Sequence, residues 1–483
     1  DMDMRQGAEC SGVMRHADSA HQQPYSGRRV MITQNEIDIA RHCITYALTQ
    51  GADAVRVSIS DSTMDNCTLL NGILDKVTHA ADRSVYLYIF AENRYGTFST
   101  NRLEKDELER FITQSITMVR MLGEDRFRSL PSPERTARDA KTGRELGLYD
   151  SRYEESDSDS RLLRARQMSI YSEAAHDCYS VISEECEYSE SCDDNFVADS
   201  QGFEGRHTET CFSVFSEMTI QDPEGCKYSG FWWESSFDRD GITLKGCSEK
   251  ALERAVRQIG PRKRRSGRYR MVVDTSVATK LIAPVLTALN AASIQQKMSF
   301  LEDTAGRKVF PEGFTIMDMA RTPGKAGSRL FDTEGVATAD SPVIENGVVK
   351  RYFVNTYMSH KMGIEPTVED ISRPCVMPYL KDEALPLEEK DLSLKDILHR
   401  ASNGILVTGF NGGNCNPVTG DFSYGIEGFA FSRGRITHPV REMLITGNMM
   451  ELWNSLTAVG NDALGSARWQ VGTLAFENVS FSA

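Results

Sequence analysis

The histidines are the side chains best able to bind a catalytic metal ion, but their spacing provides no ligand set. In a zinc peptidase helix two histidines share one face, and a glutamate beside the first activates the metal-bound water. The sequence contains neither HExxH nor HExxxH. The near pair His16 and His21 lies in a polar amino-terminal stretch, with no glutamate next to His16. We therefore predict no metal site and no catalytic residue in this chain.

A cysteine and a histidine offer a second kind of chemistry. Cys415 lies in a glycine-rich stretch and His438 follows it, so the pair could serve as nucleophile and base of an independent hydrolase. A free cysteine is more often a small buried thiol than a nucleophile. We favour the buried thiol and keep the hydrolase as the weakest hypothesis.

Two further patterns concern phosphate and nucleic acid. The stretch GFNGGNCNPVTG (409–420) lacks the spacings of phosphate-binding loops, so its glycines are expected to shape turns or permit close backbone approach. The basic run 262–265 could contact nucleic acid. Four charges without interleaved aromatics are more typical of a solvated linker, so we do not expect a nucleic-acid partner.

Composition sets the class of protein. The 483 residues carry 55 Lys+Arg against 69 Asp+Glu, a net charge of −14, with 40% hydrophobic and 26% charged residues. That is ordinary globular usage, and a prior of roughly 150 residues per domain suggests about three domains. No run of about 18 apolar residues indicates a membrane helix. Eleven scattered cysteines without a CxxC pair favour a reducing compartment, so we expect a cytoplasmic protein.

The elements that must position these side chains begin after a polar stretch, 1–30, which we treat as a tail or cloning remnant. The first expected module, 31–125, has a helix at 35–50, where apolar residues recur at helical spacing, and a closing helix at 104–122. Between them, short alternating runs predict antiparallel strands joined by hairpin turns. These runs are 55–59, 66–70, 73–78 and 85–91.

The same order recurs in a second expected module, 126–260. It has helices at 160–177 and 248–258 around the strand-like segments 179–188, 194–199, 207–219 and 225–236. The third region, 261–483, opens with a strand and an apolar helix at 276–296, and then becomes rich in strands and glycine turns. Strands that come in runs indicate an α+β class. The prediction is two helix-plus-antiparallel-sheet modules followed by a β-rich C-terminal domain with an apolar helix.

Two blocks of the third region, 328–363 and 408–453, carry DTEGV, VIENG, NPVTGDFSYG and ITGN in that order. With this combination the chain resembles the TldD/PmbA family, also called TldD/TldE proteins or modulators of DNA gyrase. The resemblance extends from about Met31 to the end and is strongest from 268 onward.

That family has two kinds of subunit, and the resemblance implies which kind this is. TldD-like subunits resemble zinc peptidases with HExxxH on a helix early in the last domain and a cysteine ligand near the carboxyl end. Aligned on this helix (277–301), the three motif positions fall at Ile282, Ala283 and Thr287, and 465–483 contains no cysteine. The chain therefore resembles the metal-free PmbA or TldE kind.

The resemblance implies a function through a partner. We expect a subunit of a cytoplasmic metallopeptidase complex that acts on unfolded peptides or small proteins, including leader peptides and antitoxins. A TldD-like partner would supply zinc and the glutamate base, and a homodimer is left open. The alternative is a non-enzymatic interaction protein that modulates DNA gyrase or a toxin–antitoxin pair, based on the family's older name and on the run 262–265.

The motif block also yields candidates for peptide binding. Polar residues alternate in part with Phe422 and Ile426, as on a strand with one polar face that could hold an extended peptide by strand addition. Equally, the face could turn to solvent while the glycines only shape turns and bulges. The candidates are Asn414, Asn416, Asp421, Ser423, Tyr424 and Glu427.

Overall fold

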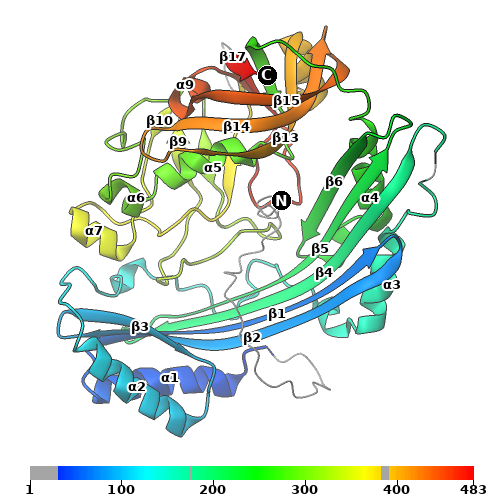
Figure 1. Ribbon diagram of the computed structural model, residues 1–483. Coiled ribbons are helices and arrows are strands. Elements are labelled where there is room, and N and C mark those ends of the chain that lie inside the picture. Colours follow the sequence, from blue (N-terminus) through cyan, green and yellow to red (C-terminus); the bar gives the residue numbers. More distant parts are fainter. Residues whose placement is uncertain (1–30, 175, 382–390) are drawn as a thin grey trace.

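The computed structural model describes residues 31–174, 176–381 and 391–483. The expected tail, 1–30, lies outside the described residues. Figure 1 shows a long curved sheet formed by the first half of the chain, with the C-terminal half lying over its concave side. Within the described ranges, no helix combines the length and the apolar character needed to cross a membrane.

The first half forms one antiparallel sheet of six strands in the order β3-β2-β1-β4-β5-β6. The two modules expected from the sequence therefore share a sheet instead of having one each. They join because β1 pairs with β4 along almost its whole length, from Arg56 opposite Asp199 to Leu70 opposite Glu185. The strands are β1 (Ala54–Leu70), β2 (Ile73–Ala91), β3 (Arg94–Thr100), β4 (Ser180–Asp199), β5 (Glu204–Gln221) and β6 (Lys227–Ser236).

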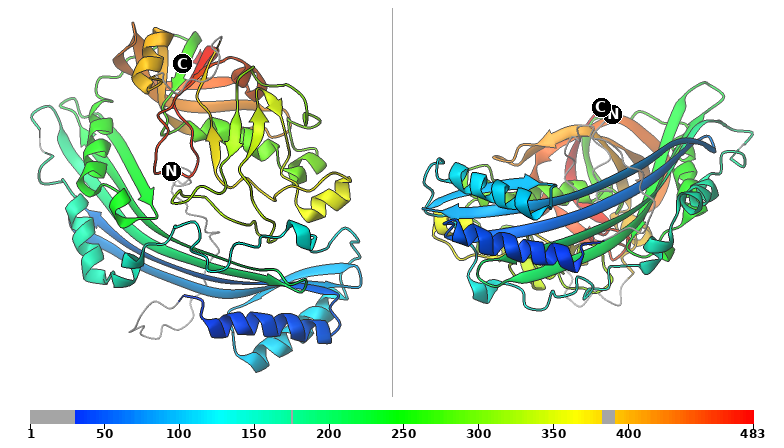
Figure 2. Two further views of the ribbon diagram at one scale, coloured as in Figure 1. Left: turned by 180° about the vertical axis from the view of Figure 1, so that it is seen from behind. Right: turned by 90° about the horizontal axis from the view of Figure 1, so that it is seen from below.

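Four helices cover the convex face of this sheet, two at each end (Figures 1 and 2). Val57 and Ile59 of β1 pack into one core with α1 and α2, whereas Cys67 and Leu69 pack into a second core with α3 and α4. The middle of β1 is polar, which is why the sequence suggested two short strands there. The helices are α1 (Gln34–Thr49), α2 (Lys105–Val119), α3 (Ser158–Met168) and α4 (Leu244–Val256).

The third predicted helix, 160–177, is shorter than expected. It ends at Met168 because the buried carboxylate of Glu184 accepts a hydrogen bond from the Ile170 N–H at 2.8 Å, and another from the Ser169 hydroxyl. A side-chain acceptor thus replaces the helical carbonyl as partner of that N–H group.

A linker, 120–157, crosses from the first helix pair to the second and joins the sheet to the C-terminal domain. It contains two short 3₁₀ turns, η2 (Pro133–Arg135) and η3 (Ser151–Glu155). Leu146 and Leu148 of the linker share a small core with Phe203, from the β4–β5 turn, and with Phe331 of the C-terminal domain. The two aromatic rings meet edge to face at 5.6 Å.

The C-terminal domain is β-rich, as predicted, and its main sheet closes on itself. Five strands form a barrel because β17 pairs with β15 on one side and with β7 on the other. They are β7 (Gly267–Val273), β13 (Asn403–Cys415), β14 (Asp421–Ser432), β15 (Arg435–Asn448) and β17 (Leu474–Ser482).

Shorter elements complete this domain. Strands β12 (Tyr379–Leu380) and β16 (Leu456–Val459) extend the main sheet beyond β17. A second, four-stranded sheet contains β8 (Ile316–Asp318), β9 (Ser341–Glu345), β10 (Val348–Val349) and β11 (Pro374–Val376). Three short helices also belong to this domain, namely α7 (Thr356–Met362), α8 (Leu394–Ala401) and α9 (Met449–Asn454).

The apolar helix predicted at 276–296 is two helices, α5 (Thr279–Ala288) and α6 (Ala291–Gln295). The break lies at Asn290, whose side-chain oxygen accepts the Ala292 N–H at 2.9 Å and so caps the second helix. The same residue forms a β-bridge with Phe353. Helix α5 contributes Leu281, Ile282 and Val285 to the main core of the domain.

Candidate functional site

Strand β14 carries most of the candidate peptide-binding residues, and its two faces differ. Asp421 and Ser423 point outward and are exposed, and Glu427 on the same face is half-buried. Tyr424 lies on the opposite face, where it is 2% exposed and stacks on Phe422 with ring centroids 5.4 Å apart. Burial raises the pKa of the Tyr424 hydroxyl. The outward face therefore does not include Tyr424.

The remaining candidates lie at the end of β13 and in the β13–β14 turn. Asn414 of β13 is exposed opposite Ser423. The Asn416 side chain accepts the Val418 N–H at 2.9 Å, so it holds the turn. Asp421 accepts the Asn448 amide at 2.9 Å and the Thr419 hydroxyl at 2.7 Å, and these hydrogen bonds lower its pKa. Asn416 and Asp421 thus have structural partners, whereas Asn414 and Ser423 face outward.

Strand addition needs an open edge, and β14 lies between β13 and β15 with both edges paired. The neighbouring β13 pairs with β7 only over 405–407. Beyond that, no strand in the described ranges pairs with the outer edge of 409–415. Figure 1 places β13 on the side of the barrel that faces the long sheet, and Arg254 of α4 donates to the Thr408 carbonyl at 3.0 Å. Among the described residues, the edge without a strand partner is therefore that of β13 over 409–415, and not an edge of β14.

The glycines of the motif allow the backbone irregularities of this strand pair. The register of β13 and β14 shifts around Gly409 and Gly413. A Cβ on Gly428 would lie 1.9 Å from the Leu406 carbonyl oxygen, and one on Gly413, which has φ +83°, would lie 2.0 Å from the Ser423 carbonyl oxygen. These glycines fit the interpretation that they shape bulges.

Cys415 and His438 are too far apart to form a catalytic pair. Cys415 lies opposite Phe422 of β14, and His438 lies opposite Ala430 of the same strand. Eight residues of strand separate those positions, which is about 26 Å. Burial also raises the pKa of the Cys415 thiol, which disfavours the thiolate. The structure therefore contradicts a catalytic pair of Cys415 and His438.

An arginine cluster, which the sequence analysis missed, lies on the C-terminal domain near β5 and β6. Arg329 donates to the Ser372 hydroxyl at 2.8 Å, and Arg468 donates to the Ser372 carbonyl at 2.9 Å. Ser235 of β6 donates to the Ser466 carbonyl at 3.3 Å, which brings the cluster beside the sheet. Its members are Arg329, Arg351, Arg373 and Arg468.

The cluster surrounds one buried carboxylate. Asp318 is 1% exposed, accepts the Arg373 N–H at 2.8 Å and lies 3.6 Å from the Arg351 guanidinium. Arg373 is only 7% exposed, and neither its Nε nor the Nε of Arg351 makes a hydrogen bond among the described atoms. Burial lowers the pKa of Arg351 and Arg468. Partly buried guanidinium groups can hold a carboxylate or another anion.

Sequence comparison covers all three parts of the chain. Residues 266–483 match the PmbA/TldA metallopeptidase C-terminal domain, residues 153–259 its central domain and residues 55–119 its domain 1. The chain belongs to the PmbA/TldD metallopeptidase family. This confirms the family resemblance drawn from the motif blocks.

Relatives and solved structures agree with this assignment. The chain is 22% identical over 424 residues to metalloprotease PmbA of Escherichia coli O157:H7, covering 88% of this chain and 91% of that protein. It is 30% identical over 236 residues to a PmbA homologue of Haemophilus influenzae, covering 48% of this chain and 50% of that relative.

Among solved structures, a candidate modulator of DNA gyrase from Bacteroides thetaiotaomicron is 36% identical with a TM-score of 0.87, covering 94% of this chain and all of that one. TldE from Thermococcus kodakarensis shares the fold at 17% identity, with a TM-score of 0.78 and coverage of 92% of this chain and all of that one.

The zinc implied by a metallopeptidase family does not fit the residues at the expected positions. Zinc requires about four nitrogen, sulfur or oxygen donors. Ile282 is fully buried in the hydrocarbon core, Ala283 has no donor, and Thr287 is exposed with a single hydroxyl. Within the part of the chain that the structure describes, no three His, Cys, Asp or Glu residues gather so that they could hold a metal ion.

The basic run 262–265 lies along β15. The Arg262 N–H donates to the Pro439 carbonyl at 3.0 Å, and Lys263 lies 3.7 Å from Glu442, with both side chains mostly exposed. The Arg264 guanidinium lies over the Tyr269 ring, 4.6 Å from its centroid. These contacts fit a solvated linker with its charges partly compensated.

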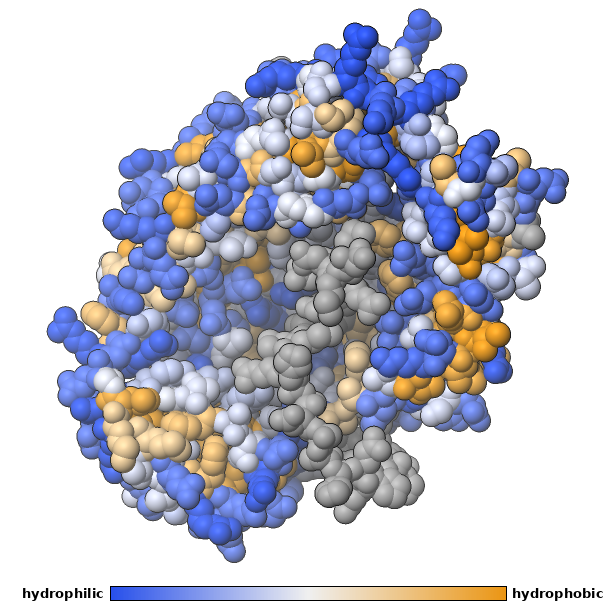
Figure 3. All heavy atoms as spheres, viewed as in Figure 1, coloured by the Kyte–Doolittle hydropathy of each residue, from blue (hydrophilic) through white to orange (hydrophobic). Residues whose placement is uncertain are grey.

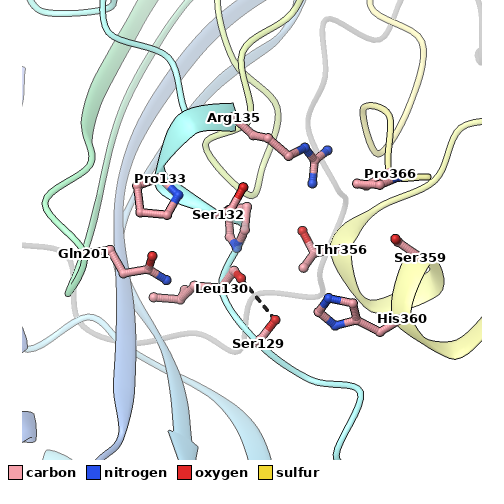
Figure 4. Close-up of a pocket in the computed structure, with 11 residues that line it drawn as sticks. Ser129, Leu130, Ser132, Pro133, Arg135, Gln201, Thr356, Ser359, His360 and Pro366 are labelled. Carbon is pink, nitrogen blue, oxygen red and sulfur yellow. Dashed lines mark hydrogen bonds between the residues drawn. The ribbon is translucent and has the colours of Figure 1, made fainter. Parts of the chain in front are cut away.

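A cavity of about 340 Å³ lies between the linker and α7. Figure 4 shows Arg135 and His360 pointing into it from opposite sides. Arg135 donates to the Thr367 carbonyl, the His360 Nδ1 lies 3.0 Å from the Phe127 carbonyl, and the Thr356 hydroxyl binds Glu334 at 2.9 Å. The contacts of Arg135 and His360 join the linker to the C-terminal domain. None of the candidate site residues from the sequence lines the cavity.

Proposed function

We propose that this chain is the metal-free subunit of a TldD/TldE-type peptidase complex in the cytoplasm, and that a TldD-like partner supplies zinc and the glutamate base. One observation carries the proposal. Where a TldD-like helix would present HExxxH, α5 places Ile282 and Ala283, and neither can bind a metal ion or move a proton. Family membership argues for the complex, and α5 argues that the chemistry lies in the other subunit.

In this proposal the chain binds and orients an unfolded peptide. The open edge 409–415 of β13 offers unpaired backbone groups for an added strand. Asn414 and Ser423 stand beside that edge and can hydrogen-bond the peptide. The arginine cluster lies on the same domain, toward the sheet, and can hold an acidic side chain or the peptide carboxylate.

The test compares the isolated chain with the chain mixed with a TldD-like subunit. Zinc content is measured by atomic absorption, and hydrolysis is followed on an unfolded peptide. We expect no stoichiometric zinc and no hydrolysis from the isolated chain, and hydrolysis by the mixture above that of the TldD-like subunit alone. Stoichiometric zinc with robust cleavage by the isolated chain would refute the proposal.

A variant pair tests the binding role within the complex. We expect Arg351→Gln to raise KM for an acidic peptide about tenfold with little change in kcat, because one cation of the anion site is lost. Arg307→Gln, at an exposed site of the same domain, serves as the matched control. Equal KM values for both variants would contradict the assignment of the cluster to peptide binding.

A second candidate function is interaction with DNA gyrase or a toxin–antitoxin pair without proteolysis. The observation in its favour is the name of the 36%-identical Bacteroides protein, a candidate gyrase modulator. Pull-down of gyrase, followed over a salt series and repeated after neutralising the run 262–265, tests it. Binding that neither salt nor the variant weakens would count against a role for the run.

A further inference from the structure

The cavity between the linker and α7 is bounded by three separate parts of the chain. The linker contributes residues from 129–135, the β4–β5 turn contributes Gln201, and α7 with the loop after it contributes residues from 356–366. Leu130 in its lining is buried and Gln201 and His360 are exposed, so the cavity reaches from the interior to solvent. Its volume of about 340 Å³ lies at the lower end of the range for small-molecule sites, about 300–1,000 Å³.

The hydroxyl groups around the cavity mostly have partners already. The Ser129 hydroxyl donates to the next carbonyl along the chain at 3.1 Å, and the Ser359 hydroxyl donates to the Ile364 carbonyl at 2.6 Å. Thr356 binds Glu334 through its hydroxyl and its N–H, both at 2.9 Å, and Glu334 does not itself line the cavity. The hydrogens of these hydroxyl groups are therefore not available to a ligand.

Three side chains keep hydrogen-bonding groups for a ligand. Arg135 binds the Thr367 carbonyl through Nη2, and among the described residues its Nε and Nη1 make no hydrogen bond and no carboxylate pairs with it. The side-chain amide of Gln201 also makes no hydrogen bond in the described ranges. The His360 Nδ1 lies 3.0 Å from the Phe127 carbonyl, which only accepts, so Nδ1 carries the hydrogen and Nε2 of the neutral ring is an acceptor.

These three groups match the chemistry of the carboxyl end of a peptide. The Arg135 guanidinium can bind a carboxylate, and none of the described residues that line the cavity is acidic. The His360 Nε2 can accept an amide N–H, and the Gln201 amide can donate to an amide carbonyl. An aliphatic side chain can pack on the apolar part of the lining, which consists of Leu130, Pro131, Pro133 and Pro366.

The surroundings of the cavity suit a small polar ligand. The surface around α7 and the linker, at the left of Figure 3, is mostly hydrophilic. A hydrophobic patch lies elsewhere, near the β1–β2 turn and α3 at the right of the same view, and includes Ile73 and Leu74. A partner with a broad apolar surface would therefore find little to bury at the cavity.

We propose that this cavity binds an N-acylated amino acid, the chemistry of a peptide's carboxyl end, with its carboxylate on Arg135 and its amide N–H on His360 Nε2. Such a ligand contacts the linker, the β4–β5 turn and α7 at once, so its binding stabilises the junction between the long sheet and the C-terminal domain. The inference is independent of the proposed peptidase function, because it requires neither zinc nor a partner subunit and shares no residue with the arginine cluster.

The experiment is isothermal titration calorimetry of the full chain with N-acetyl-leucine. We expect saturable binding at one site, about tenfold weaker binding of N-acetyl-leucinamide, which lacks the carboxylate, and about threefold weaker binding of 4-methylpentanoate, which lacks the amide N–H. Absence of saturable binding would overturn the proposal. Equal binding of the amide would refute the role of Arg135, and equal binding of 4-methylpentanoate would refute a site for a peptide end.

Variants assign the binding to this cavity. We expect Arg135→Gln to weaken the binding of N-acetyl-leucine about tenfold, and Gln201→Ala, at an exposed position of a turn, to weaken it about threefold. Arg138→Gln is the matched control, because Arg138 is an exposed arginine of the linker that does not line the cavity. Its binding should equal that of the unaltered chain.

Thermal unfolding shows whether each variant is folded and gives a second measurement. N-acetyl-leucine should raise the Tm of the unaltered chain and of Arg138→Gln, and raise that of Arg135→Gln much less. If Arg135→Gln does not fold, Gln201→Ala decides. Binding that Gln201→Ala leaves unchanged, or that is lost in Arg351→Gln of the arginine cluster instead, would overturn the proposal.

Discussion

Asp193 of β4 is a carboxylic acid whose ionisation opposes folding. It faces the concave side of the sheet, and burial, with smaller contributions from Glu209 and Asp61, raises its pKa to about 6. An unfolded aspartate titrates near 3.9. The native state thus binds the proton more tightly, so this group's contribution to stability is full below about pH 3.9 and is lost as pH rises through 6.

The prediction is that Asp193→Asn stabilises the protein at pH 7 by about 1–2 kcal/mol, because the amide stays neutral. Thermal unfolding from pH 4 to 7 should show the advantage of the variant growing as pH rises. Asp303→Asn is the control, since Asp303 is exposed and its left-handed backbone suits asparagine equally well. An advantage that does not change with pH would contradict the assignment.

At the scale of single residues, the sequence exposed the substituted motif positions but not the arginine cluster. Ile282 and Ala283 fall at the positions of the first histidine and the glutamate of HExxxH. The absence of metal ligands at these positions could therefore be recognised from the sequence alone. Arg329 and Arg468 are far apart in the chain and meet only through the fold around Ser372. Tyr424 was grouped with polar neighbours, although its ring is apolar enough to join the core.

At the scale of elements, the bulged pair of β13 and β14 depends on glycine. We expect Gly428→Ala to destabilise the C-terminal domain by about 2–4 kcal/mol, because a Cβ 1.9 Å from the Leu406 carbonyl oxygen forces the strands apart. Gly465→Ala, where a Cβ meets nothing within 4 Å, is the control. Chemical denaturation followed by tryptophan fluorescence measures both, and equal midpoints would disprove the packing argument.

Element types followed from periodicity, while their lengths depended on what covers them. Helices α1, α2 and α4 were found near their predicted ranges because each has one apolar stripe. The middle of β1 lies between the two helix-covered ends, so its apolar alternation disappears although its hydrogen bonds continue. Asn290 was a capping residue hidden inside an apolar pattern, and it divided the predicted helix.

At the scale of the whole molecule, the small core around Phe203 and Phe331 is an apolar contact between the long sheet, the linker and the C-terminal domain. We expect Phe203→Ala to cost about 3 kcal/mol and to separate thermal unfolding into two transitions, because the sheet and the C-terminal domain lose apolar contact with each other. Phe231→Ala, on edge strand β6, is the control for loss of an aromatic ring. Differential scanning calorimetry measures the transitions. A single transition for both the Phe203→Ala and the Phe231→Ala variant would disprove the role of Phe203 in joining the two halves.

The overall class, α+β with a β-rich end, could be predicted because strand runs and helix patterns are local. The union of two modules into one sheet could not, since the pairing of β1 with β4 joins residues more than a hundred positions apart. Closure of the barrel through β17 depends on similarly distant partners.

That pairing of β1 with β4 also bears on how this protein could have diversified. The first two modules share the backbone hydrogen bonds between β1 and β4. Neither module could therefore be exchanged between ancestral genes as a unit that folds by itself. Recombination between the two modules would give products whose β1 and β4 strands come from different parents and are not matched to each other. The two segments should therefore have been inherited together, whereas the barrel beyond them had more freedom to be paired with a different scaffold.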